Sequence, residues 1–242
     1  MDLDDEAAVL ATCDAGKRYG RRWALSAATV RVPANSVVAL VGPNGAGKTT
    51  LLHLAVGLAR PDAGRVTVLG RSPVAATARG DVGFVAQDKP LYRRFRVGEL
   101  LRMGAALNAR WDQRYAAGRL TGLGIDPRRR ADTLSGGAQA QVALTLALAK
   151  RPRLLLLDEP AAALDPVARR AFLDGIADEA RTQGITVLHS SHDVAELDRA
   201  CDHLLIVKDG TVVRAGAIAE LVPAGQGLEA FVLSVLGGGG AA

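Results

Sequence analysis

Short apolar segments recur along the chain, and most of them are either uninterrupted or alternate with polar residues at every second position. Both patterns are typical of β-strands. In the first half of the chain, the predicted strands are Val9 to Asp14, Thr29 to Val32, Val37 to Val41, Arg65 to Leu69 and Val82 to Val85. In the second half, they are Leu154 to Leu157, Thr186 to His189, Leu204 to Val207 and Thr211 to Arg214.

Segments with helical spacing separate many of these strands. The predicted helices are Thr49 to Leu58, which the turn sequence PDAG at Pro61 to Gly64 ends, and Pro166 to Thr182 and Asp193 to Ala200. Strands that alternate with helices favour a mainly parallel sheet with helices packed on it. The sequence therefore predicts an α/β fold that opens with a β-rich stretch.

One long segment, from about Leu91 to Lys150, has almost no strand signal. Its Leu and Ala residues have helical spacing, so we expect an inserted helical subdomain at about residues 90–150. No internal repeat is visible. We therefore expect residues 1–236 to form a single domain, followed by a flexible Gly- and Ala-rich tail at residues 237–242.

The composition is that of an ordinary globular protein, with 242 residues, 49% of them hydrophobic and 23% charged. The two cysteines, Cys13 and Cys201, are too few for a disulfide scaffold and are expected to be reduced. The longest apolar run, Val142 to Ala149, is far short of the roughly 20 residues that span a bilayer. The acidic N-terminus lacks the features of a secretory signal, so we expect a cytosolic protein.

The net charge of +5 comes from 30 basic and 25 acidic residues, and arginine outnumbers lysine among the basic ones. Two short clusters stand out, one with Arg93, Arg94 and Arg96 and one from Arg128 to Arg130. Because both are short, we interpret them as solvated surface rather than as a nucleic-acid site. No nucleic-acid partner is expected.

The clearest candidate for chemistry is the sequence GPNGAGKT between the strand Val37 to Val41 and the helix that follows it. It matches GxxxxGK[ST], in which glycines let backbone N–H groups point at a polyphosphate and the helix N-terminus adds positive charge. Lys48 would reach the β and γ phosphates, and the Thr49 hydroxyl would ligate Mg²⁺. The expected polyphosphate-binding residues are Gly42, Pro43, Asn44, Gly45, Ala46, Gly47, Lys48, Thr49 and Thr50.

A second candidate follows the four-leucine run Leu154 to Leu157, whose composition is typical of a strand buried on both faces. Asp158 and Glu159 stand at its carboxyl end, where open α/β sheets bind their ligands. Adjacent residues on a strand point in opposite directions, so we expect different roles for them. Asp158 would order the Mg²⁺ shell, and Glu159 would polarise the attacking water.

The sequence LSGGAQ, from Leu134 to Gln139, resembles the LSGGQ signature of ABC-type ATPases. The resemblance extends to Tyr19 in KRYG, Gln87 in FVAQD, Asp165 at the end of AAALD and His192 in SSHD. These elements occur in the family's order between Tyr19 and about Gly216. The chain thus resembles an ABC transporter ATP-binding subunit.

The resemblance implies a P-loop NTPase (RecA-like) parallel-sheet core, an N-terminal antiparallel β subdomain and an inserted α-helical subdomain. It also implies roles for single residues. The Tyr19 ring would stack on adenine, although a tyrosine packed on the β-rich edge is the alternative. Gln87 would meet Mg²⁺ and the reactive water, and His192 would contact the γ-phosphate and help to hold that water.

In this family, two nucleotide-binding subunits form a head-to-tail dimer that encloses two ATP molecules. By resemblance, Ser135, Gly136 and Gly137 would close on the ATP of a partner subunit, and Asp165 would link the two sites across the interface. The partner subunit is expected to be a second copy or a related chain. Ala138, Ala161 and Ala162 depart from the family pattern, and the last two remove hydroxyls that could couple the two sites.

Transport is the activity that the resemblance favours, with separate permease subunits and the chain bound at the cytoplasmic membrane face. We expect the permease to contact the segment after Gln87, where Leu91, Tyr92 and Phe95 are interleaved with arginines. The stretch from His189 to Gly216 resembles ABC-2-type exporters, so we expect export. The alternatives are an importer subunit and a soluble ABC ATPase that acts on ribosomes or DNA.

Overall fold

The computed structural model describes residues 8–88, 91–162, 164–191 and 201–237. A six-stranded sheet with the order β5-β6-β7-β3-β8-β9 forms its centre. All neighbouring strands are parallel except β8 and β9, which pair antiparallel. The strands are β3 (Val37–Val41), β5 (Val82–Val85), β6 (Leu154–Asp158), β7 (Thr186–Ser191), β8 (His203–Lys208) and β9 (Thr211–Ala217).

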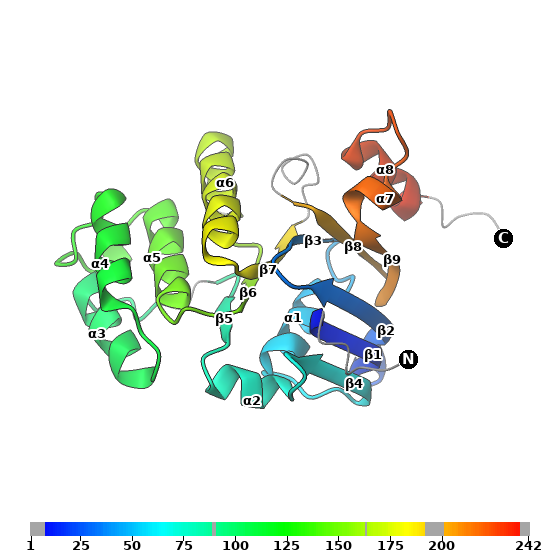
Figure 1. The fold of residues 1–242 in the computed structure, drawn as a ribbon, viewed down its shortest axis with the longest axis horizontal. Coiled ribbons are helices and arrows are strands. Elements are labelled where there is room, and N and C mark those ends of the chain that lie inside the picture. Colours follow the sequence, from blue (N-terminus) through cyan, green and yellow to red (C-terminus); the bar gives the residue numbers. More distant parts are fainter. Residues whose placement is uncertain (1–7, 89–90, 163, 192–200, 238–242) are drawn as a thin grey trace.

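A separate three-stranded antiparallel sheet, with the order β2-β1-β4, lies beside the central sheet. It consists of β1 (Ala8–Tyr19), β2 (Arg22–Pro33) and β4 (Ala63–Val68). β1 and β2 are joined by a turn at Gly20 and Arg21, so they form a hairpin in which Tyr19 pairs with Arg22. In Figure 1 the helices α3 to α5 lie at the left, and this antiparallel sheet lies at the lower right, below β8 and β9 of the six-stranded sheet.

The longer helices follow the predicted order, and three short or terminal ones had no predicted bounds. α1 (Lys48–Val56) follows β3, and α6 (Pro166–Gln183) connects β6 to β7. Between β5 and β6 lie α3 (Val97–Leu107), α4 (Gln113–Gly122), the 3₁₀ turn η1 (Ala131–Thr133) and α5 (Gly136–Leu148), drawn in green in Figure 1. α2 (Pro73–Ala78) was not predicted, whereas α7 (Ile218–Leu221) and α8 (Leu228–Gly237) agree with the one or two helices expected after Gly216.

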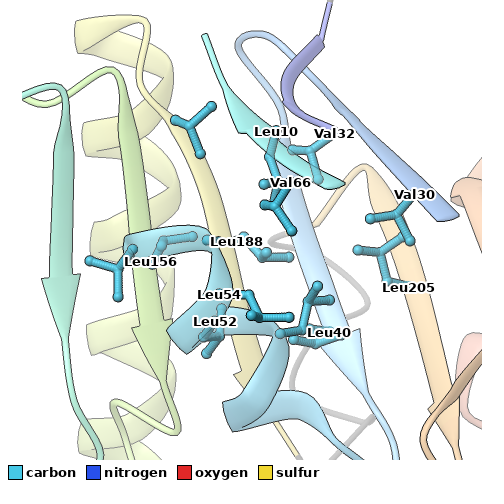
Figure 2. Close-up of a cluster of buried hydrophobic side chains, with 14 of the residues drawn as sticks. Leu10, Val30, Val32, Leu40, Leu52, Leu54, Val66, Leu156, Leu188 and Leu205 are labelled. Carbon is cyan, nitrogen blue, oxygen red and sulfur yellow. The ribbon is translucent and has the colours of Figure 1, made fainter. Parts of the chain in front are cut away.

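The main hydrophobic core fills the space between the two sheets and around α1. Figure 2 shows side chains of this core, which come from the antiparallel sheet, from α1 and from the central sheet. Leu10 and Val30 come from the antiparallel sheet, Leu52 from α1, and Leu156 and Leu188 from the central sheet. The uninterrupted apolar strands β3 and β6 are buried along their whole length, as their sequences predict.

The predicted fold class is confirmed, with a mainly parallel core, an N-terminal antiparallel sheet and an inserted group of helices. The tail begins later than predicted, because Gly237 is the last residue of α8. The predicted helix Asp193 to Ala200 and the rest of the tail lie outside the described residues. Among the described helices, none combines the length and the apolar character needed to cross a bilayer.

Candidate functional site

The carboxyl ends of four neighbouring parallel strands bring most of the predicted site residues to one edge of the sheet. The phosphate loop follows β3, Gln87 follows β5, Asp158 ends β6 and Ser191 ends β7. Because parallel strands end at the same edge, residues more than 100 positions apart in the sequence become neighbours there. The arrangement thus has the form of a ligand site in an open α/β sheet.

The phosphate loop from Gly42 to Lys48 is packed tightly against the antiparallel sheet. Gly47 is the N-cap of α1 and has a φ of 110°, in the region that favours glycine. A Cβ atom there would lie 2.5 Å from the carbonyl oxygen of Ala24 on β2. Any side chain at this position would therefore collide with β2, which explains why the close approach requires glycine.

Lys48 lies beneath this loop, and its side chain is only 6% exposed. Its Nζ donates hydrogen bonds to the carbonyl oxygens of Gly42, at 2.7 Å, and Pro43, at 3.2 Å. Burial lowers the pKa of Lys48, whereas the nearby carboxylates of Glu159 and Asp158 act in the opposite direction. The ammonium group is thus held by the loop where it can meet phosphate oxygens.

Asp158 and Glu159 differ in environment as the strand geometry predicts. Asp158 is 3% exposed, and its Oδ1 accepts a 2.7 Å hydrogen bond from the Ser190 hydroxyl. Glu159 has a φ of 43°, and its backbone N–H donates to the same Ser190 oxygen at 2.9 Å. Ser190 on β7 therefore fixes both the carboxylate of one residue and the backbone of the other.

The Glu159 side chain reaches into the site between two predicted partners. Its Oε1 lies 3.9 Å from Lys48 Nζ, and its Oε2 accepts a 3.3 Å hydrogen bond from Gln87 Nε2. These contacts show that the structure brings together Lys48 at the start of α1 and the residues that follow β5 and β6. A carboxylate in this position can accept a proton from a water molecule that lies against a phosphate held by the loop.

A cavity of about 530 Å³ extends from these residues to the β1–β2 hairpin. Its lining includes Tyr19, which is 52% exposed. Lys17 lies 5.7 Å from the ring centroid and also forms a 3.2 Å ion pair with Asp62. The complete lining is Tyr19, Arg22, Ala24, Asn44, Gly45, Gly47, Lys48, Thr49, Thr50, Gln87 and Glu159.

The predicted signature residues do not line this cavity. Ser135 is exposed and caps α5, where its hydroxyl oxygen accepts a 3.3 Å hydrogen bond from the N–H of Ala138. Gly136 and Gly137 are the first residues of the same helix. Asp165 caps α6 in a similar way, through a 2.9 Å hydrogen bond from the N–H of Ala168. All four therefore lie outside the cavity formed by their own chain.

Three residues of the site were not found from the sequence, and one predicted residue is not covered. Arg22 and Ala24 line the cavity, and Ser190 holds the two acidic residues. Arg22 could have been found from its pairing with Tyr19 across a hairpin, and Ser190 could have been found from its position in the SSHD sequence. His192 lies outside the described residues.

The oxygen groups at this edge fit the requirements of Mg²⁺, which prefers hard oxygen ligands and keeps waters and phosphates in its shell. Thr49 is an exposed residue of the cavity, and Asp158 has a buried carboxylate at the end of β6. Gln87 contributes an amide from β5. Together with phosphate oxygens, these side chains could complete the shell of one ion.

An apolar groove of about 430 Å³ lies between the central sheet and the inserted helices. Ala86 lines this groove, and the next residue, Gln87, lines the nucleotide-sized cavity. Leu107 lines it as well and is 75% exposed. Its other lining residues are Leu58, Phe84, Val85, Leu91, Leu100, Met103, Gly104, Asn108, Trp111, Ala143, Leu146, Ala147 and Lys150.

Comparison with known proteins places these features in one family. The sequence profile of the ABC transporter family matches residues 25–162. An iron(III) import ATP-binding protein of Rhodococcus jostii is 38% identical over 212 residues, which are 85% of this chain and 61% of the relative. A thiamine import ATP-binding protein of Chelativorans sp. is 37% identical over 207 residues, or 83% of each chain.

The solved structures agree with this result. The structure of an ATP-binding subunit of an ABC transporter matches 94% of this chain and 99% of its own, with 26% identity and a TM-score of 0.83. The chain spans 61% of the length of the Rhodococcus relative, so the match with that protein is confined to part of it.

The comparisons also correct the expected direction of transport. Export was predicted from the stretch His189 to Gly216, but the relatives at this level of identity are named import ATP-binding proteins. The prediction of an exporter is therefore wrong. The physical reason is that the described residues of this stretch belong to β7, β8 and β9 of the central sheet, where their apolar character serves burial and strand pairing.

Proposed function

The chain belongs to the ABC transporter family and is an ATPase, and from this premise we propose that it powers an importer. It would work as one of two ATP-binding subunits attached to permease subunits at the cytoplasmic face of the membrane. The import names of its relatives support the direction. The observation that carries the proposal is that Ala86 and Gln87, which are adjacent, line the apolar groove and the ATP-sized cavity respectively.

ATP would bind with its base on the Tyr19 ring and its phosphates against the loop from Gly42 to Lys48. Lys48 would exchange part of its contact with Glu159, now at 3.9 Å, for phosphate oxygens. Glu159 would then accept a proton from water as the water oxygen bonds to the γ-phosphorus. The bond from that phosphorus to the β–γ bridging oxygen breaks, which yields ADP and phosphate.

Mg²⁺ would be held by Thr49, Asp158 and Gln87 together with phosphate oxygens, and when bound it would neutralise charge on the phosphates. The Ser190 hydroxyl orients Asp158 for this contact, because it already donates to the Asp158 carboxylate at 2.7 Å. His192 would help to hold the water, as the family resemblance implies.

A second subunit would complete each site. Ser135 is exposed at the N-terminus of α5, outside the cavity of its own chain, and free N–H groups at a helix start suit an anion. We infer that Ser135, Gly136 and Gly137 contact the ATP of a second copy of this chain, with Asp165 near the interface. Closure around two ATP molecules and reopening after hydrolysis would convert the reaction into movement.

The permease would dock in the apolar groove through an amphipathic helix of a cytoplasmic loop. Leu107 and Leu58 are 75% and 67% exposed at its rim, an arrangement suited to apolar side chains from a partner. Tyr92 and Phe95, which stack at 5.2 Å between ring centroids, are also exposed in the segment that follows Gln87. A movement of Gln87 on ATP binding would therefore be transmitted to the permease through this segment.

The two arginine clusters lie together beside this segment. Arg96 and Arg130 form a backbone bridge, and the N–H of Val97 donates to the carbonyl oxygen of Arg129 at 2.9 Å. The two arginine clusters, which are separate in the sequence, thus lie side by side, with Arg130 in an ion pair with Asp132 at 2.6 Å. The permease helix would therefore carry acidic residues next to its apolar face.

Recovery of the tagged chain from native membranes tests this proposal, with identification of the proteins that copurify. We expect a polytopic permease with the wild-type chain and its loss with Leu107→Asp, which places a charge in the groove. Leu233→Asp is the matched control, because Leu233 is 60% exposed on α8 and does not line the groove. Recovery of ribosomal proteins instead of a permease would contradict the proposal.

A further inference from the structure

The β1–β2 hairpin contributes a cation to the ATP-sized cavity that the sequence did not indicate. Tyr19 and Arg22 are the pair that closes this hairpin. Residues directly opposite each other on paired strands share one face of the sheet. Arg22 and Tyr19 therefore project from the same face of the antiparallel sheet, and both residues line the cavity.

The alternation of β2 extends this wall toward the phosphate loop. Ala24, two residues after Arg22, lines the same cavity, and its carbonyl oxygen is the atom that excludes a side chain at Gly47. Arg22 is thus part of a continuous wall that runs from the candidate base platform to the loop that binds phosphates.

Two other basic side chains of the hairpin have identified partners. Lys17 forms an ion pair with Asp62, and the Arg18 guanidinium lies 5.6 Å from the ring centroid of Trp23. Arg22 is exposed, and within the described part of the chain its side chain has no hydrogen bond or ion pair. Its guanidinium is therefore available to a ligand in the cavity.

The charges already in the cavity favour an anionic contact for this group. Lys48 is partly compensated by Glu159, at 3.9 Å, so a bound triphosphate would retain negative charge. Arginine has five N–H donors and no acceptor, which suits phosphate oxygens. Adenine offers only neutral ring nitrogens as acceptors, so a guanidinium gains more from the charged phosphate oxygens.

We propose that Arg22 is a nucleotide-binding residue that contacts phosphate oxygens from the open side of the cavity, opposite the loop that holds Lys48. Arg22 thus contributes to the affinity for ATP and ADP through their phosphates and does not contribute to recognition of the base. This inference rests on the proposed binding of ATP in the cavity, and it adds to that site a residue that the sequence motifs do not include.

Equilibrium binding of ATP and ADP to the purified full-length chain tests the inference. We expect Arg22→Ala to weaken binding of both nucleotides by about 10-fold, as for loss of a charged hydrogen bond, and Arg22→Lys to weaken it less. Arg21→Ala is the matched control, because Arg21 is exposed in the same turn and does not line the cavity. It should bind like the wild type.

Salt dependence distinguishes a direct charge contact from a structural role. Rising salt should weaken ATP binding to the wild type more than to Arg22→Ala, because screening acts on a contact that the variant lacks. Equal affinity and equal salt dependence in Arg22→Ala and Arg21→Ala would overturn the role of Arg22 alone. Failure of the wild type to bind ATP, with Lys48→Met no weaker than the wild type, would overturn the proposed ATP site as well.

Discussion

The hydroxyl group of Ser190 holds two acidic residues of the site, Asp158 and Glu159, although no sequence motif assigns it this role. Ser190 donates to the buried Asp158 carboxylate at 2.7 Å and accepts from the Glu159 N–H at 2.9 Å. Glu159 also has a φ of 43°, which costs a non-glycine residue about 1 to 2 kcal/mol. The hydrogen bond from its N–H helps to hold this conformation.

Ser190→Ala should lower both stability and activity. The substitution removes the donor to a buried carboxylate and the acceptor of a backbone N–H, so we expect the free energy of unfolding to fall by about 1 to 3 kcal/mol. Urea denaturation measures this change, and ATP hydrolysis by the same preparation should fall as Asp158 and Glu159 lose their orientation. An unchanged free energy of unfolding would show that Ser190 does not support these residues.

Lys48→Met should abolish ATP binding while leaving the fold intact. The substitution replaces a buried ammonium by an apolar side chain of similar length, and it removes the positive charge that faces the phosphates. Isothermal titration with ATP measures the loss, and the urea midpoint serves as the control for folding. Near-normal affinity for ATP would remove Lys48 from the site.

At the scale of elements, the patterns that the sequence encodes most strongly were predicted best. β3 and β5 have the predicted bounds, since their uninterrupted apolar residues are buried in the central sheet. β1 and β2 extend beyond the predicted strands because they pair along a hairpin of 12 residues each, and such long-range pairing does not follow from local alternation. α2 was missed because six residues with a proline at the start have no helical period.

The candidate site was predictable where the chemistry lies in a continuous motif. The loop from Gly42 to Thr49 and the pair Asp158 and Glu159 could be placed at the same sheet edge from the order of the strands alone. Arg22 and Ser190 could not, because their roles come from a cross-strand pair and from neighbouring parallel strands. Gln87 was located only through the family resemblance.

Two glycines of the phosphate loop should respond differently to the same substitution. The Cβ atom of Gly45→Ala would have no atom within 4 Å, but it would stand on a backbone with a φ of 77°. We therefore expect the free energy of unfolding to fall by about 1 kcal/mol. Gly47→Ala adds a contact of 2.5 Å with the Ala24 carbonyl oxygen, which must displace β2 or the loop. Gly47→Ala should therefore lose far more stability and ATP affinity; equal effects in urea denaturation and titration would contradict this packing.

At the scale of the whole molecule, the direction of transport is the feature that the sequence predicted wrongly. Export was inferred from the C-terminal third, yet the related chains are named import proteins. The fold explains why such an inference is weak, because the described surfaces that matter here are an ATP-sized cavity and an apolar groove. Neither of these two surfaces distinguishes import from export.

The global stability should depend on pH through one buried histidine. Burial lowers the pKa of His189 from 6.5 to about 4, and its Nε2 lies 3.4 Å from Cys201, a thiol whose pKa is raised to about 12 by burial. The unfolded chain binds a proton below pH 6.5, whereas the native chain does so only near pH 4. The stabilisation is therefore present above pH 6.5 and is lost as the pH falls toward 4, by up to about 3 kcal/mol.

Urea denaturation at several pH values between 7.5 and 4.5 measures this dependence. The variant His189→Gln cannot titrate in this range, so its stability should fall less steeply with pH than that of the wild type. Asp62 and Asp112, whose pKa values are lowered by backbone hydrogen bonds, are present in both proteins, so their contribution cancels in the comparison. Equal slopes in the two proteins would show that His189 is not the responsible group.

The central claim is that Glu159 drives hydrolysis in a site that two copies of the chain complete. The most direct test is the molar mass and ATPase rate of Glu159→Gln with ATP and Mg²⁺, measured by size-exclusion chromatography with light scattering. We predict that the variant binds ATP, has almost no turnover and elutes as a dimer, which Ser135→Arg in the same background returns to a monomer. Wild-type turnover by Glu159→Gln, or a monomer saturated with ATP, would contradict the account.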